Sequence, residues 1–266
     1  MELPELDHLG NLSEFNLKES SSIVRLKKAP YGLKQAPRLW SIEINSYLLS
    51  LGFRQSSIEP SLYIADSAIL LLYVDDMLIA FKDISVAEEI KQRLQKKSKM
   101  TDLGPGKRFL GMTIERTRNG YNLHQESYIE SLLYKYGTAG SYGACTPIET
   151  HTKLDIKSGD IDALVDQKAY LAIVGSLMCA ALRTRPDISY AMGLLSRFNS
   201  GPRTRHFTAA KRVLWYLKRT KDLKLEYKQT GKKLQGFVDS GWANEKDQKS
   251  IGGYTFTLGG AAVSWD

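Results

Sequence analysis

The sequence predicts an α+β fold that combines amphipathic helices with short antiparallel strands. Apolar residues recur at helical spacing in several long segments, and short apolar runs of strand length lie between some of them, bounded by turn residues. From residue 167 to residue 221 the pattern is helical, and after residue 223 it changes to short strands. We therefore expect a helix-and-hairpin region, then a helical region, then a sheet.

The first part of the chain is expected to form a helix, a hairpin and a second helix. Residues 1–30 lack a sustained period, apart from a short strand-like run at 23–26. A helix is predicted to begin near Pro37, because proline suits the first helical turn, and to end before Gly52.

The second helix is predicted to begin with a capping-box pattern at Ser85 and to end near Lys97. Two strand-like pieces follow at 108–114 and 120–123. The Asn-Gly pair at 119–120 is typical of a tight turn, so these pieces are predicted to pair as a hairpin.

The remaining elements are separated by a polar stretch at 146–166, which we interpret as a linker. Before it, a helix over 129–136 ends at Gly137. After it, the pattern predicts helices at 167–182, 186–200 and 206–221, and strands at 223–227, 234–238, 254–258 and 261–265.

The most distinctive segment is Tyr73-Val74-Asp75-Asp76, which lies between the apolar runs 68–72 and 77–81. It predicts a hairpin whose tip carries two adjacent carboxylates. Mg²⁺ prefers one or two protein carboxylates together with substrate phosphates, so such a tip suits nucleotidyl transfer. An acidic turn without a metal explains these four residues equally well, because aspartate is common in turns.

Charge and composition indicate a nucleic-acid partner and no membrane. The 266 residues carry a net charge of +8, and no apolar run approaches the roughly 20 residues that span a bilayer. With no secretory segment, we expect an intracellular, cytoplasmic protein. The two cysteines, Cys145 and Cys179, are too few for a disulfide framework and are predicted to be small core residues.

Basic residues gather on one amphipathic segment near the end of the helical region. They could bind the phosphate backbone of a nucleic acid, and a solvated helix surface explains them equally well. The six residues of this face are Arg203, Arg205, Lys211, Arg212, Lys218 and Arg219.

A second basic segment, residues 27–40, delivers Lys34, Gln35 and Arg38 to the start of the first predicted helix. Backbone N–H groups at a helix start favour anions, and neighbouring cations add charge-assisted contacts. A proline-initiated helix with basic residues beside it is the simpler interpretation.

Together, segment 31–38 and the Tyr73–Asp76 hairpin resemble, in this order, the reverse transcriptase of copia-type long-terminal-repeat retrotransposons. The resemblance covers nearly the whole chain. The C-terminal part of the chain resembles the start of the ribonuclease H that follows the reverse transcriptase in this family. Further matching segments are 102–104, 109–111, 146–147, 175–178, 184–188, 195–198, 209–214, 236–244, 253–254 and 258–265.

The resemblance implies a palm subdomain that holds two Mg²⁺ and extends a DNA primer on an RNA or DNA template with deoxynucleoside triphosphates. Asp75 and Asp76 would be the catalytic metal ligands, and Tyr73 would lie under the primer end. Asp239 would match the first carboxylate of ribonuclease H.

Other roles follow from the same resemblance. Gln35 would contact the template base or the incoming nucleotide, and Lys34 and Arg38 would contact phosphates. Residues 109–111 would belong to the primer-gripping hairpin and 129–136 to the thumb. Other segments of a retroelement polyprotein would be further partners, and the resemblance adds a nuclear or particle phase to the expected cytoplasmic localisation.

The resemblance also implies a domain division. Residues 1–145 would be a partial reverse transcriptase with palm and thumb but without fingers and the first palm strand, and 146–166 a linker. Residues 167–222 would be a helical connection, and 223–266 a truncated ribonuclease H-like start.

Two departures from the family bear on activity. Family members hold a third carboxylate in a strand upstream of the region that residues 1–5 resemble, and Gly241 stands where a second ribonuclease H aspartate is usual. We therefore expect a polymerase that is impaired or inactive alone, with a noncatalytic nucleic-acid-binding remnant as the alternative.

Overall fold

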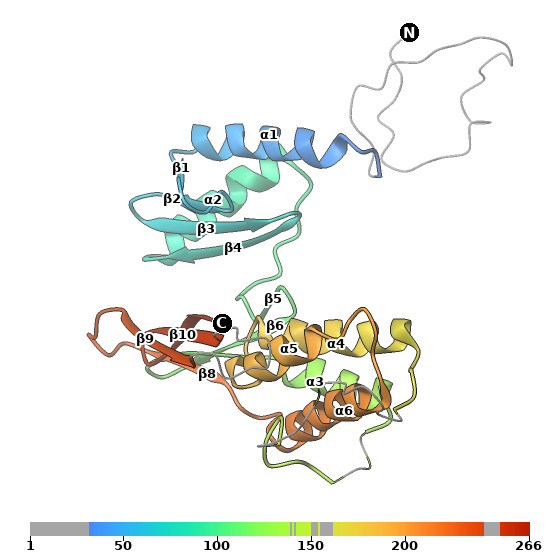
Figure 1. Ribbon diagram of the computed structural model, residues 1–266. Coiled ribbons are helices and arrows are strands. Elements are labelled where there is room, and N and C mark those ends of the chain that lie inside the picture. The colour runs from blue at the N-terminus through green and yellow to red at the C-terminus, as the bar shows by residue number, and fades with distance from the viewer. Residues whose placement is uncertain (1–31, 139, 141, 150–153, 155–161, 242–250) are drawn as a thin grey trace, which may run out of the picture. The chain divides into compact units, whose positions relative to one another are not determined.

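The computed structural model describes residues 32–138, 140, 142–149, 154, 162–241 and 251–266, and their contacts divide the chain into two compact units (Figure 1). The units are Met1–Gly104 and Pro105–Asp266. The strand predicted at 23–26 lies outside the described residues. The predicted domain boundaries at 145, 166 and 222 stay a prediction.

The first unit is a four-stranded antiparallel sheet with two helices, and it contains the predicted helix, hairpin and second helix. The strand order is β1-β2-β3-β4. Its elements are α1 (Ala36–Ser50), β1 (Arg54–Gln55), β2 (Leu62–Ile64), β3 (Ala68–Tyr73), β4 (Asp76–Phe81) and α2 (Ile84–Lys97).

Both helices cover the same face of this sheet. On β3, Ala68 and Leu70 are buried and share one core with Ile44 and Leu48 of α1 and Leu94 of α2. Because side chains alternate along a strand, the odd-numbered residues of β3 face away from the helices. The sheet therefore has one covered face and one open face.

The ends of the two helices follow local chemistry. Gly52 has a φ of +90°, as expected for a glycine just after a helix. The start of α2 differs from the prediction, because Asp83 rather than Ser85 is the capping residue. The Asp83 carboxylate accepts the Ser85 N–H at 3.1 Å, and the Ser85 hydroxyl donates to the same oxygen.

The second unit contains two antiparallel sheets. One has the order β5-β6-β7-β8 and the other β11-β10-β9. Their strands are β5 (Arg108–Phe109), β6 (Met112–Thr117), β7 (Gly120–His124), β8 (Leu225–Lys228), β9 (Gln235–Gly241), β10 (Ile251–Leu258) and β11 (Ala261–Trp265).

One predicted strand of this unit is wrong. Residues 108–114 form two strands, β5 and β6, joined by a turn in which Leu110 and Gly111 both have positive φ. Only Gly111 carries a turn signal, and leucine rarely adopts this conformation.

The helices of the second unit build the larger core. They are α3 (Glu126–Lys135), α4 (Gln167–Ala181), the 3₁₀ turn η2 (Pro186–Ile188), α5 (Ser189–Ser196) and α6 (Thr204–Arg219). The helix predicted over 186–200 is therefore a 3₁₀ turn followed by a shorter α-helix. Fully buried residues from four of the helices meet in this core, among them Ile129, Tyr170, Leu177, Leu195 and Leu214.

Two further expectations concern single residues and the membrane. Cys145 is exposed and Cys179 half-buried, so the prediction that both are core residues is wrong. No helix in the described part of the chain has the length and apolar character needed to cross a bilayer.

Candidate active site

The predicted acidic hairpin is present, with Val74 and Asp75 as its two-residue turn. Strands β3 and β4 pair so that Tyr73 lies opposite Asp76. Val74 has a φ of +53°, whereas Asp75 is not among the residues with positive φ. Positive φ at the first turn position alone is the pattern of a type II′ turn, which usually has glycine there. A β-branched residue in this conformation is strained.

The hairpin presents an aromatic ring and a carboxylate on the open face of the sheet. Tyr73 is an odd-numbered residue of β3, and it is 53% exposed. Residues that pair directly in an antiparallel ladder point to the same face, so Asp76 shares this face with Tyr73. Asp75, in the turn, is exposed as well.

A side chain from α1 fixes the hairpin tip. The Trp40 indole Nε1–H donates a hydrogen bond to the carbonyl oxygen of Val74 at 2.9 Å. The Trp40 ring packs against the core of the same unit. The sequence could not predict this contact, since no local pattern links residues 34 positions apart.

This bond brings the start of α1 and the tip of the acidic hairpin to the same end of the first unit (Figure 1). Both are predicted to contact nucleic acid or nucleotide. Gln35 is the N-cap residue of α1, and its side chain makes no capping bond. The side chains of Lys34, Gln35 and Arg38 are all exposed. The first turn of α1 contains no acidic residue that would compete with a bound anion.

The donor set at the tip fits Mg²⁺ in part. Asp75 and Asp76 provide two adjacent exposed carboxylates, which match the one or two that Mg²⁺ takes when substrate phosphates complete its shell. Within the described ranges, no three His, Cys, Asp or Glu side chains come together in a group that could hold a metal. The acids near the start of the chain, Glu2, Glu5 and Asp7, lie outside those ranges.

The basic face on α6 is partly neutralised. The Arg205 Nε lies 2.6 Å from a carboxylate oxygen of Asp162, and Arg212 pairs with Glu149 at 2.7 Å. The ammonium of Lys211 lies 5.1 Å from the centre of the Phe207 ring. The arginines at 205 and 212 therefore direct their charge within the protein, and the role of the face in binding phosphate stays a prediction.

The remaining members of the face differ in exposure. Arg203 precedes α6 and donates from NH1 to the backbone oxygen of Asp162 at 2.5 Å. Lys218 is half-buried and Arg219 is exposed.

Asp239, the residue matched to ribonuclease H, lies on β9 with its side chain exposed. Its carboxylate accepts the N–H of Ser240 at 2.9 Å, and in the ladder it pairs with Gly253. No group of three potential metal ligands includes it in the part of the chain that the structure describes. Its assignment stays a prediction.

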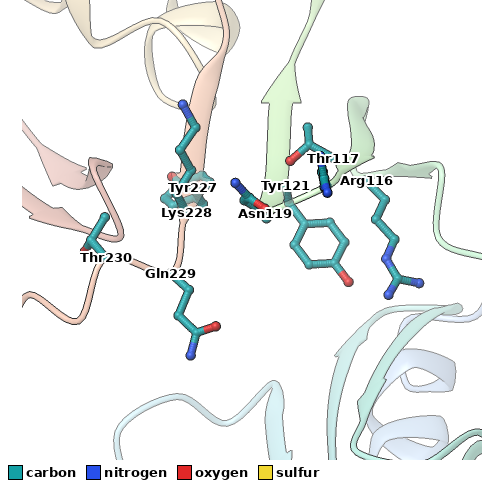
Figure 2. A pocket seen from close by; sticks show the side chains of 10 residues that line it. Arg116, Thr117, Asn119, Tyr121, Tyr227, Lys228, Gln229 and Thr230 are labelled. Carbon is teal, nitrogen blue, oxygen red and sulfur yellow. The ribbon is translucent and has the colours of Figure 1, made fainter.

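A groove that the sequence did not indicate lies in the second unit (Figure 2). It has a volume of about 790 Å³ and is lined by residues 116–121 of the β6–β7 hairpin and by residues 227–230 at the end of β8. Strand β8 comes to this place because it pairs with β7, placing Tyr227 opposite Tyr121.

Comparison with known proteins supports one family. A family model described as reverse transcriptase (RNA-dependent DNA polymerase) matches residues 11–150. No solved structure matches the chain.

Curated relatives cover most of the chain. The chain is 38% identical over 257 residues to the "Retrovirus-related Pol polyprotein from transposon TNT 1-94" of Nicotiana tabacum, a match that covers 91% of this chain and 19% of the relative. It is 36% identical over 249 residues to the polyprotein from transposon RE1 of Arabidopsis thaliana, covering 91% of this chain and 17% of the relative.

A shorter relative matches over most of both lengths. The "Putative transposon Ty5-1 protein" of Saccharomyces cerevisiae is 36% identical over 242 residues, which cover 88% of this chain and 78% of that protein. The chain spans about a fifth of the length of the tobacco and Arabidopsis polyproteins.

Proposed function

The chain belongs to the reverse transcriptase family found in retrotransposon Pol polyproteins, and from this membership we propose that it is part of an RNA-directed DNA polymerase. Its reaction would be the extension of a DNA primer with deoxynucleoside triphosphates on an RNA or DNA template. The observation that carries the proposal is the pair Asp75 and Asp76, exposed at the tip of a hairpin that is anchored through Val74.

Asp75 and Asp76 are the residues that would hold Mg²⁺. Bound there, the metal would activate the primer 3′-hydroxyl and offset the charge that develops on the triphosphate. The bond from Trp40 holds the two-residue turn at which both carboxylates lie. A fixed backbone lowers the cost of arranging these groups around a substrate.

The neighbouring side chains suit the handling of primer and nucleotide. Tyr73 presents an exposed ring on the same face as Asp76, where it would support the primer end. Lys34 and Arg38 are exposed cations at the start of α1, where the helix dipole also favours phosphate. The Gln35 side chain makes no capping bond there and would contact a base or the incoming nucleotide.

The test is primer extension on a homopolymer template with Mg²⁺, using the full chain. We expect weak incorporation by the unmodified chain, and at least about 100-fold less by the double variant Asp75→Asn, Asp76→Asn, since losing groups that stabilise transition-state charge costs several kcal/mol. The matched control is Glu59→Gln, Glu88→Gln, which removes two exposed charges elsewhere in the same unit. Equal incorporation by the Asp75, Asp76 variant and the unmodified chain would refute the proposal.

A further inference from the structure

We propose that the groove between the β6–β7 hairpin and the end of β8 binds single-stranded nucleic acid, independently of the acidic hairpin. The groove lies in the second unit and is lined by residues 116–121 and 227–230. Its volume of about 790 Å³ is in the range of functional pockets.

The strand register places a cation and two aromatic rings in one row across the sheet. Arg116 of β6 pairs with Tyr121 of β7, and Tyr121 pairs with Tyr227 of β8. Directly paired residues share a face, so these three side chains lie side by side. Figure 2 shows Arg116 and Tyr121 extending in the same direction, whereas Lys228 extends in the opposite one.

The two tyrosines of the row have different environments. The Tyr227 hydroxyl donates to the carbonyl oxygen of Ala262 at 2.5 Å, and its ring packs against the small core beside β11. Tyr121 is 49% exposed. Tyr227 is therefore held in place, while the Tyr121 ring remains available to stack on a base.

The charge of the sheet differs between its two faces. On the face opposite the row, Glu115 pairs with Lys224 and Glu226 with Lys228, each at 2.8 Å. At the groove, neither Arg116 nor Arg118 has an ion pair or a hydrogen-bond partner among the described residues. Among the described residues of this hairpin, the uncompensated positive charge thus lies on the groove side, where it complements a phosphate backbone.

These features fit a single strand better than a duplex. An exposed aromatic ring beside free cations is the arrangement by which proteins stack unpaired bases and track the adjoining phosphates. Bases inside a duplex are already stacked on each other, so the Tyr121 ring would find no face to cover.

The test is fluorescence anisotropy with a labelled 20-nucleotide oligo(dT), without Mg²⁺ or nucleotides, on the full chain. We expect the variant Arg116→Ser, Arg118→Ser to bind roughly 10-fold more weakly. Its plot of log affinity against log salt should be shallower by about 0.7 for each phosphate that the variant no longer neutralises. Tyr121→Leu should weaken binding while leaving the salt slope unchanged, because it removes stacking and no charge.

The matched control is Lys168→Ser, Arg197→Ser, which removes two positive charges from exposed positions at α4 and at the end of α5 in the same unit, outside both the groove and the basic face of α6. Binding that falls equally in the control, or that is unchanged in the groove variant, would overturn the proposal. Because the measurement needs no nucleotide incorporation, its outcome is separate from that of the polymerase assay.

Discussion

The guanidinium of Arg185 binds the carboxylate of Asp187 through two hydrogen bonds, Nε to Oδ1 at 2.9 Å and NH2 to Oδ2 at 2.6 Å. Arg185 is only 1% exposed, and it also donates to the carbonyl and hydroxyl oxygens of Thr220. The Tyr216 hydroxyl donates to Asp187 Oδ2 at 2.8 Å. The network therefore ties the start of η2 to the end of α6.

Removing the carboxylate should strongly destabilise the second unit. In Asp187→Ala the buried Arg185 charge keeps its Thr220 hydrogen bonds and its place over the Tyr216 ring but loses its counterion, and such a loss typically costs about 3 kcal/mol or more. We expect a loss of about that size in the free energy of unfolding by urea, followed by circular dichroism. The control is Glu226→Ala, which breaks an exposed pair with Lys228 and should cost less than about 1 kcal/mol. If both variants lost a similar amount of unfolding free energy, the burial of Arg185 would not explain the cost of removing its counterion.

The same network predicts a pH dependence. Burial of the Asp187 carboxylate acts to raise its pKa, but the hydrogen bonds and charge of Arg185, with the Tyr216 hydroxyl, outweigh burial and lower the pKa. A lowered pKa in the folded state stabilises the protein above the unfolded pKa of about 4, and this contribution is lost as the pH falls through the folded value.

We therefore expect the stability difference between the unmodified chain and Asp187→Asn to be constant from about pH 7 to pH 5 and to shrink below about pH 4. Urea unfolding at several pH values across this range and down to about pH 3 measures it. A difference that stays constant to the lowest pH would show that Asp187 is not the titrating group.

The sequence predicted local features well and distant pairings poorly. The acidic hairpin followed from apolar runs on both sides of Tyr73–Asp76, and α3 from its helical spacing and Gly137. The Trp40–Val74 bond joins residues 34 positions apart, which no helical or strand periodicity connects. The sequence did not predict that Arg185 is buried. Arginine is rarely buried without partners, and one of its partners, Thr220, lies 35 residues away.

Gly120 illustrates the same limit. An Asn-Gly pair predicted a turn at 119–120, yet the turn residues are Arg118 and Asn119, and Gly120 begins β7. A Cβ at Gly120 would lie 1.8 Å from the carbonyl oxygen of Tyr227. The glycine is required by β8, a strand about 100 residues further along the chain, and local turn chemistry could not reveal that.

Gly120→Ala should therefore destabilise the second unit, because the new methyl group meets backbone that cannot move without breaking the β7–β8 ladder. We expect a loss of at least about 2 kcal/mol, the scale of overpacking a tight site. The matched control is Gly175→Ala, at an exposed position of α4 with open space around it. It should stabilise by about 0.5–1 kcal/mol, as alanine does in a helix interior. Urea unfolding compares the two, and a stabilising Gly120→Ala would contradict the close approach of β8.

The last prediction concerns the hairpin tip. Trp40→Phe keeps an aromatic ring but loses the N–H that binds Val74, so the strained turn should open more often. We expect backbone amides of residues 72–77 to exchange hydrogen severalfold faster, as measured by mass spectrometry. The matched control is Tyr47→Phe, which removes a bond of the same kind from α1 to the backbone oxygen of Arg93.

Val74→Gly should act in the opposite sense, because glycine adopts positive φ without strain and the exposed valine side chain contributes little burial. We expect a gain of about 1 kcal/mol in stability, given roughly 1–3 kcal/mol of relieved strain against the entropy of the added glycine. In the double variant Trp40→Phe, Val74→Gly the exchange at 72–77 should slow again, since an unstrained turn depends less on the indole. If Trp40→Phe and Tyr47→Phe change exchange at the tip equally, the indole does not hold the turn that carries Asp75 and Asp76.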